Sequence, residues 1–306
     1  MTAAVLRIAP DVPVRWPSGP RARAAGFALG AVLLWSTWPT LAAWTQPAPP
    51  LLVFGLAAAV GFCVMLLRAT ATGRAAGFLA IRPATLVFVA LALLANNVLY
   101  LLAMPRIGPA EANVIAYLWP VLLTAMGAVV GRSGLTALQG LGIGISFVGA
   151  AIVIGPSLGA TMDFAGIALA FASGLVFAVY ALIRSYGREP QDVVGPSMGL
   201  IALICLPAHF AFEPATPLTA TQLVAIAGIG VAPLSLSNML WDQAGRTGQL
   251  PLISTIAYLT PLGALLLLAL SGAAAVTWAT AGGAAFIVAG AFAAANFFKT
   301  TKGSRS

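Results

Sequence analysis

The amino-acid sequence repeats itself at an offset of 141 residues, the distance from Asn97 to Asn238 (238 − 97). The repeat is carried by residue types other than the abundant Ala and Leu. At this offset the matched pairs include Asn97/Asn238, Tyr117/Tyr258, Pro120/Pro261, Gly142/Gly283 and Gly149/Gly290. A single chain therefore holds two copies of one folding unit, and we expect both copies to arrange their helices alike.

Long apolar stretches indicate that the chain spans a membrane. Hydrophobic residues make up 60% of it and charged residues 7%, and a helix needs about 20 apolar residues to cross the hydrocarbon. Ten such runs are predicted, at 26–45, 51–68, 84–103, 110–130, 135–154, 164–184, 192–210, 219–241, 250–270 and 276–298. Each half holds five, and because five is odd, the second half enters the bilayer in the opposite orientation. The predicted fold is an all-α membrane protein with ten transmembrane helices in two inverted five-helix repeats, 26–154 and 164–298.

Positive charge is confined to one side of the predicted spans. The formal net charge is +8, and if the spans alternate, only Arg106 of the 15 Lys and Arg residues lies on the opposite side. Lys and Arg are retained on the cytoplasmic side of membranes. We therefore expect a cytoplasmic N-terminal segment, 1–25, and a cytoplasmic tail, 299–306. The basic charge reflects this topology and does not indicate a nucleic-acid partner.

Three prolines interrupt the predicted spans at depth: Pro39 in the first, Pro120 in the fourth and Pro261 in the ninth. Proline has no N–H to donate to the carbonyl four residues earlier, and its ring crowds that carbonyl. Such interruptions are tolerated where they pack against protein or line a water-filled cavity. Because Pro120 and Pro261 match in the repeat, we expect hinges or cavity walls at these prolines. Simple packing kinks are the alternative.

Small residues mark the fifth and tenth spans. Gly142 and Gly149 are seven residues apart, as are their repeat mates. This spacing puts each pair on one helix face, where small side chains let two helix backbones approach closely. Gly140 and Gly144 add a further small-residue pair. These two spans are predicted to be scaffold, with the pathway elsewhere.

Charged side chains are absent from the middle of the predicted spans. No Asp, Glu, Lys, Arg or His occupies the central third of any of them. A proton-coupled pump normally needs a titratable group there, and a carrier of phosphates needs Lys or Arg, so a neutral or zwitterionic solute is expected. An enzyme within the membrane would need a His pair, a metal cluster or paired acids. We therefore expect no catalytic residues, no metal and no cofactor.

Neutral polar and aromatic residues do cluster at depth. Buried amides and phenols need hydrogen-bond partners, and aromatic faces bind rings and ammonium groups, so these side chains are candidates for a solute site. Trp44, Trp241 and Trp278 instead fit an interfacial aromatic belt. Tyr117 and Trp119 can line one cavity only if the helix unwinds before Pro120. The predicted substrate-binding residues are Trp35, Trp38, Asn96, Asn97, Tyr100, Tyr117, Trp119, Phe177, Tyr180, Asn238 and Tyr258.

Two short motifs carry a resemblance to a known family. The Trp-Ser-x-Trp-Pro of residues 35–39 and the Tyr-Leu-Trp-Pro of residues 117–120, together with ten spans in inverted halves, resemble the EamA-type drug/metabolite transporter superfamily, and most of all its bacterial aromatic amino acid exporters. The resemblance implies a bacterial inner-membrane protein with a central cavity lined by spans one, three, four, six, eight and nine. Asn96 and Asn97 depart from the more aromatic or His-containing patch expected there.

The sequence thus favours a transporter that exports aromatic and other neutral amino acids from the cytoplasm by alternating access. We expect facilitated diffusion down the solute gradient rather than ion coupling. Its partners would be a small-molecule substrate and the lipid bilayer. Because one chain supplies both gates, a monomer is sufficient. A broad-specificity exporter of drugs or small metabolites, a proton-coupled antiporter and a channel are the alternatives.

Overall fold

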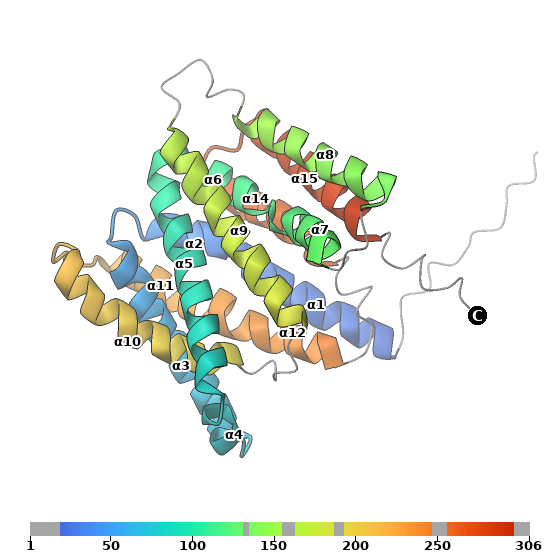
Figure 1. Ribbon diagram of the computed structural model, residues 1–306. Helices are drawn as coiled ribbons and strands as arrows, with labels where there is room; N and C mark the ends of the chain where they lie inside the picture. Colours follow the sequence, from blue (N-terminus) through green and yellow to red (C-terminus); the bar gives the residue numbers. More distant parts are fainter. Residues whose placement is uncertain (1–18, 131–134, 155–162, 187–192, 247–255, 297–306) are drawn as a thin grey trace, which may run out of the picture.

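The computed structural model describes residues 19–130, 135–154, 163–186, 193–246 and 256–296, and within them the chain forms helices joined by turns and loops (Figure 1). The first half contains α1 (Pro20–Ser36), α2 (Trp38–Trp44), α3 (Pro50–Ala71), α4 (Ala75–Leu79), α5 (Pro83–Ile107), α6 (Pro109–Ala116), α7 (Trp119–Val130) and α8 (Ala137–Ile154). The second contains α9 (Phe164–Tyr186), α10 (Val194–Phe212), α11 (Ala220–Val231), the π-helical turn η3 (Ala232–Leu236), α12 (Ser237–Arg246), α14 (Thr260–Leu270) and α15 (Trp278–Asn296).

Helical segments of membrane-spanning length agree with most of the predicted spans. Eight in the described part are long and apolar enough to cross a bilayer: Arg21–Trp44, Pro50–Ala71, Pro83–Ile107, Pro109–Val130, Ala137–Ile154, Phe164–Arg184, Val194–Phe212 and Ala220–Ala244. Two further apolar helices, Thr260–Leu270 and Trp278–Ala294, are shorter. The start of the predicted ninth span, 250–255, lies outside the described residues. The all-helical membrane fold is thus confirmed for the described part.

All three predicted interruptions are present, and at each one a helix begins one residue before the proline. α2 begins at Trp38 before Pro39, α7 at Trp119 before Pro120, and α14 at Thr260 before Pro261. Proline fits the first turn of a helix because the N–H that it lacks would have no partner within the helix there. The sequence did not predict a fourth irregularity, the π-helical turn η3, which contains Pro233.

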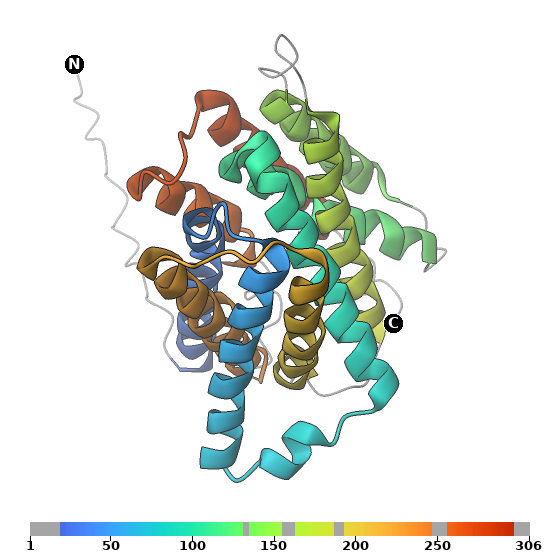
Figure 2. The same cartoon turned by 90° about the vertical axis from the view of Figure 1, so that its left-hand side faces the viewer.

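The main core lies among α3, α5, α10 and α11, where α3 contacts the other three and α5 also contacts α10 (Figure 2). Its largest fully buried side chains include Phe54, Met104, Met198, Ile201 and Ile229. Many large apolar side chains instead point outward, among them Leu203 (74% exposed) and Phe210 (81% exposed). Outward-facing apolar surface on this scale suits contact with lipid tails, which are as apolar as the side chains.

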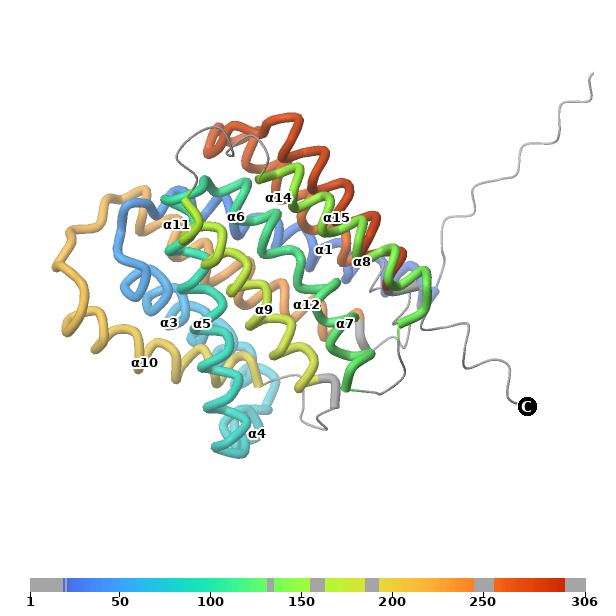
Figure 3. The backbone as a smooth tube through the Cα atoms, turned by 45° about the horizontal axis from the view of Figure 1, so that its top comes forward, coloured from blue at the N-terminus to red at the C-terminus, as the bar shows by residue number. Residues whose placement is uncertain are grey.

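The helices α8 and α15 lie side by side along one flank of the bundle (Figure 3). A Cβ added to Gly142 would lie 2.6 Å from the carbonyl oxygen of Gly290, and one added to Gly149 would lie 2.6 Å from that of Gly283. The two helices are therefore antiparallel and in backbone contact. The expectation for Gly140 and Gly144 was wrong, since nothing lies within 4 Å of a Cβ built on either. Those two glycines occupy another face of α8.

Candidate functional site

A cavity of about 590 Å³ lies between the interrupted helices and their neighbours. Its lining includes ten of the eleven predicted substrate-binding residues: Trp35, Trp38, Asn96, Asn97, Tyr100, Tyr117, Trp119, Phe177, Tyr180 and Asn238. α8 and α15 contribute no lining residue. The predicted separation between a cavity wall and two supporting helices is therefore present in the described part of the chain.

The cavity extends toward one end of the bundle, which carries Arg68, Arg184 and Asp242 among its lining residues and is here called the arginine end. Arg68 and Arg184 lie in the last turns of α3 and α9, and Asp242 lies in the second half of α12. Met65 and Met198 also line the cavity, so α3 and α10 form part of a wall that was predicted without the second and seventh spans. The charged groups were predicted to lie near the membrane surface, outside the site.

A break in the chain explains how Tyr117 and Trp119 can share one cavity. α6 ends at Ala116, Tyr117 and Leu118 form a turn, and α7 begins at Trp119. On a continuous helix, residues two apart do not face each other. The turn removes this restriction, as predicted from Pro120, and both rings line the cavity.

The backbone groups released at the interruptions are covered by protein. The carbonyl of Ala257, four residues before Pro261, accepts a hydrogen bond from Thr260 Oγ1 at 2.7 Å. The carbonyl of Thr260 in turn accepts one from Ser36 Oγ at 3.1 Å, which joins the break after α1 to the start of α14. The carbonyl of Ala116 lies against Gly174, where a Cβ would approach it to 2.4 Å. Gly174 is thus required for this close contact.

Aromatic side chains form two groups on the cavity wall. In one, the rings of Trp38 and Tyr100 are 6.0 Å apart between centroids. In the other, Phe177 contacts Trp119 edge to face at 5.0 Å and Tyr180 at 5.6 Å. Tilted and edge-to-face pairs of this kind are favourable aromatic geometries. Because their partners hold these rings in place, they present a preformed apolar wall.

The amide side chains on the wall are held by the protein itself. Asn96 Nδ2 donates to the carbonyl and the hydroxyl of Ser173 on α9, each at 3.0 Å. Asn97 Nδ2 donates to the Leu93 carbonyl at 2.7 Å, and its repeat mate Asn238 donates to the Leu234 carbonyl at 2.9 Å. The two repeat mates therefore make the same contact, each to the residue four positions earlier.

Two aromatic residues lie elsewhere than predicted. Tyr258 is not among the cavity-lining residues; its ring contacts Phe292 of α15 at 6.3 Å. Trp241 was assigned to an interfacial belt, but its ring packs on Trp35 at 5.1 Å and it lines the cavity. Trp278, which is 95% exposed, remains compatible with a belt position.

Helical spacing could have identified several lining residues that the sequence interpretation missed. Residues four apart share a helix face. Arg184 follows Tyr180 by four residues and Asp242 follows Asn238 by four, while Asn113 precedes Tyr117 by four. All three line the cavity, so the faces of the predicted site residues extend further along their helices than the prediction assumed.

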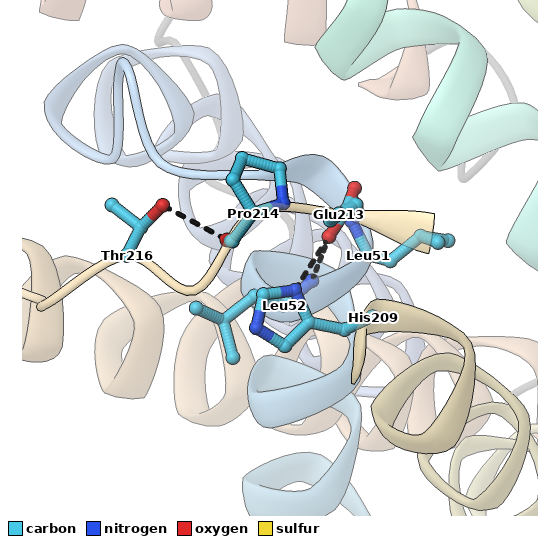
Figure 4. Close-up of polar contacts among 6 residues, drawn as sticks. All are labelled: Leu51, Leu52, His209, Glu213, Pro214 and Thr216. Carbon is cyan, nitrogen blue, oxygen red and sulfur yellow. Dashed lines mark hydrogen bonds and ion pairs between the residues drawn. The ribbon is translucent and has the colours of Figure 1, made fainter. Parts of the chain in front are cut away.

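Polar contacts join the helices at the end of the bundle opposite the arginine end, here called the far end. The Glu213 carboxylate after α10 accepts hydrogen bonds from the backbone N–H groups of Leu51 and Leu52 at 2.9 and 3.2 Å, and lies 2.9 Å from His209 Nδ1 (Figure 4). A carboxylate is stabilised at a helix N-terminus, here that of α3. None of these residues lines the cavity.

Two further contacts add to the far end. Thr280 Oγ1 of α15 donates to Glu111 of α6 at 2.9 Å, and Arg106 pairs with Asp163 at 3.1 Å. A hydrogen bond from the Gly166 backbone N–H, followed by the Arg106 guanidinium, lowers the pKa of Asp163 below its ordinary value. The far end is therefore tied together across several helices, whereas the cavity reaches the arginine end.

A bundle of membrane-spanning helices around a cavity with interrupted walls is typical of a membrane transport protein. Residues 22–155 match the EamA-like transporter family. The chain is also 28% identical over 279 residues to the aromatic amino acid exporter YddG of Ancylobacter novellus, a match that covers 89% of this chain and 96% of the relative. The predicted resemblance to EamA-type transporters, and to an aromatic amino acid exporter among them, is confirmed.

A solved crystal structure of a protein has the same fold. It matches with a TM-score of 0.71 at 27% identity, and the match covers 92% of this chain and 99% of the other. The likeness therefore extends beyond residues 22–155 to both halves of the chain.

Proposed function

We propose that this protein exports aromatic and other neutral amino acids across a bacterial inner membrane by alternating access, without coupling to an ion gradient. The observation that carries the proposal is the distribution of side chains in the cavity. Aromatic rings and amides line its inner part, while the charged lining residues Arg68, Arg184 and Asp242 lie at the arginine end. The similarity to an aromatic amino acid exporter supports this substrate class.

The proposed architecture has ten spans in two inverted five-helix repeats, 26–154 and 164–298. It is supported by contacts that recur at the repeat offset. Asn97 and Asn238 bond their own helices in the same way, and Pro120 and Pro261 both follow the first residue of a helix. Pro39, Pro120 and Pro261 would serve as hinges, and a monomer would contain both gates.

The proposed orientation places both termini in the cytoplasm, because positive charge is retained there. The arginine end is then cytoplasmic, and the described conformation faces inward. The contacts of Glu213 and Glu111 would hold the outer side closed. Export then requires these far-end contacts to loosen as the arginine end closes.

The test is efflux of labelled phenylalanine from proteoliposomes, measured with and without a pH gradient or a membrane potential. Saturable efflux with counterflow, indifferent to both gradients, is expected. Absence of any phenylalanine flux would contradict the proposed substrate class. Accumulation driven by a pH gradient would instead assign the protein as a proton-coupled antiporter, and flux without saturation or counterflow would indicate a channel.

A broad-specificity exporter of drugs or small metabolites is the second candidate, and the size of the cavity favours it. Its volume of about 590 Å³ falls within the range of about 300–1,000 Å³ that accommodates drug-sized ligands. Competition of labelled phenylalanine efflux by a panel of unrelated aromatic cations separates the two. Strong inhibition by cations without an amino acid group would favour the broader exporter.

A further inference from the structure

Two side chains at the cavity wall are buried with a polar atom that has no hydrogen-bond partner among the described residues. They are Tyr100, which is 4% exposed, and Asn113, which is 2% exposed; the atoms are Tyr100 Oη and Asn113 Nδ2. A buried donor left without a partner costs folding free energy. A third such atom, Thr40 Oγ1, belongs to a residue that does not line the cavity.

Other polar side chains of the cavity wall do have hydrogen-bond partners. The amides of Asn96, Asn97 and Asn238 all donate within the protein. Asn113 differs because its side-chain Nδ2 has no partner among the described residues. Its backbone is nevertheless fixed: its carbonyl accepts a hydrogen bond from the Tyr117 N–H at 3.1 Å, at the break before α7. The Tyr100 ring is likewise held against Trp38. The fold therefore positions both residues, while the polar atoms Tyr100 Oη and Asn113 Nδ2 remain without a hydrogen-bond partner among the described residues.

The chemistry of the two atoms selects one part of an amino acid. An amide Nδ2 only donates, and a phenol donates readily. An ammonium group has only donors and cannot satisfy Asn113 Nδ2, whereas a carboxylate accepts several hydrogen bonds and makes strong ones. α7 begins at Trp119 of the same wall, and the N-terminus of a helix also favours a negative group.

We propose that Tyr100 Oη and Asn113 Nδ2 donate hydrogen bonds to the carboxylate of the transported solute when the cavity closes around it. Each atom is buried in the described conformation. The contact therefore belongs to the closed state that follows entry from the arginine end. The inference rests on the proposed export of amino acids and adds the group of the solute that is recognised.

The test compares phenylalanine with phenylalaninamide, which keeps the ring and lacks the carboxylate, for binding to the purified full-length protein. Tyr100→Phe removes only the hydroxyl, and Asn113→Leu removes the amide at similar size. Each variant is expected to weaken phenylalanine binding about ten-fold, since a hydrogen bond to a charged group contributes about 1.5 kcal/mol or more and 1.4 kcal/mol is a factor of ten. Binding of phenylalaninamide should change less than about two-fold.

Thermal stability supplies the second measurement, because a merely structural role would affect it. Tyr100→Phe deletes a hydroxyl without a partner, so the melting temperature of the ligand-free protein should stay the same or rise. Arg68→Gln tests a competing donor, the guanidinium at the arginine end of the cavity. Loss of the preference for phenylalanine in Arg68→Gln alone would overturn the inference.

The outcomes also separate this inference from the proposed function. If the wild type transports phenylalanine but binds the amide equally well, or if both wall variants retain the wild-type preference, the carboxylate assignment is wrong and the exporter stands. If the wild type binds neither compound and transports no phenylalanine, the inference and the proposed function fail together. A lowered melting temperature in Tyr100→Phe would assign the hydroxyl a structural role and overturn the inference.

Discussion

The α8–α15 pair and the cavity wall are both built from packed helices, but they differ in what lies between the backbones. In the pair, glycines bring carbonyl groups so close that a Cβ would collide with them. In the wall, large aromatic side chains and interrupted helices keep the backbones apart and leave a cavity. Continuous helices with glycines at their contact make a close approach, whereas breaks and large side chains make a chamber.

The difference also concerns hydrogen bonding. Inside a membrane every backbone group needs a partner, and an unbroken helix supplies its own. Among the described residues, a side-chain hydrogen bond between α8 and α15 runs from Ser146 Oγ to the Ile287 carbonyl at 3.2 Å. The wall releases carbonyls at its breaks, and the Thr260 hydroxyl covers that of Ala257. The Ser36 hydroxyl adds a bond from the break after α1 to the Thr260 carbonyl. A chamber in a membrane thus requires polar residues that a supporting pair does without.

The supporting pair should be the region most sensitive to a small change. Gly142→Ala places a Cβ 2.6 Å from the Gly290 carbonyl, so α8 and α15 must separate, at a cost of about 3 kcal/mol or more. We expect a lower yield of folded protein and a melting temperature reduced by several degrees in detergent. Gly144→Ala is the matched control, with nothing within 4 Å of its Cβ, and equal effects of the two substitutions would contradict the packing.

Truncating an aromatic side chain of the cavity wall should change the stability of the protein little but slow transport. Trp119→Ala removes a ring that lines the cavity and contacts Phe177. Loss of the contact between this ring and the transported phenylalanine, about 1.5 kcal/mol, corresponds to roughly a ten-fold slower efflux from proteoliposomes. Tyr258→Ala, outside the cavity, is the comparison. If both variants transported at the wild-type rate in folded protein, the proposed site would be wrong.

The far end tests how firmly the wall helices are held together. Glu213→Gln leaves a side chain of the same shape but removes the charge that caps α3, and it places an amide donor beside the Leu51 and Leu52 N–H groups. The free energy of unfolding should fall by about 1–2 kcal/mol. Thr216→Ala, a change at a partly exposed residue in the same loop, should have little effect on the denaturation midpoint.

The smallest effect is expected at Asp163. Its pKa is lowered in the folded protein, chiefly by the Gly166 N–H, so its contribution to stability is present above its ordinary pKa and is lost as the pH falls through the folded value. Asp163→Asn should therefore lower the melting temperature slightly at neutral pH and not at strongly acidic pH. A larger difference from the wild type in acid than at pH 7 would reverse the assigned sign.

Much of this architecture could be predicted because it follows from local rules. Proline disfavours a helix interior because it lacks the N–H and crowds a carbonyl, and Pro39, Pro120 and Pro261 located the interruptions to within a residue. Pro207, in contrast, lies inside α10 without ending that helix. Glycine spacing identified the faces of α8 and α15 through Gly142 and Gly149, but spacing alone also selected Gly140 and Gly144. Which small-residue face meets another helix depends on how the bundle closes, and a single helix does not contain that information.

The candidate site shows the same limit. Tyr258 was assigned to the cavity because it is an aromatic residue at depth in the ninth predicted span. Like its repeat mate Tyr117, it lies at a turn before a proline. The repeat conserves the turn, but α15 lies beside the second turn and receives its ring. Trp241 and Arg184 were assigned to the surface from their chemical type, although their helix faces continue the cavity wall. The type of a residue predicts the environment that its side chain prefers, and the packing of the helices decides which environment it occupies.

The glycine contact between α8 and α15 has the form of an isologous dimer interface contained in one chain. Gly142 meets Gly290, the mate of Gly149, while Gly149 meets Gly283, the mate of Gly142. In such an interface position i contacts j and j contacts i, as across a two-fold axis between identical subunits. A substitution at either glycine position of one half therefore affects the contact at one matched glycine position in the other half. Two separate copies of such a half would carry the same self-complementary surface, which makes gene duplication and fusion a direct route to this chain.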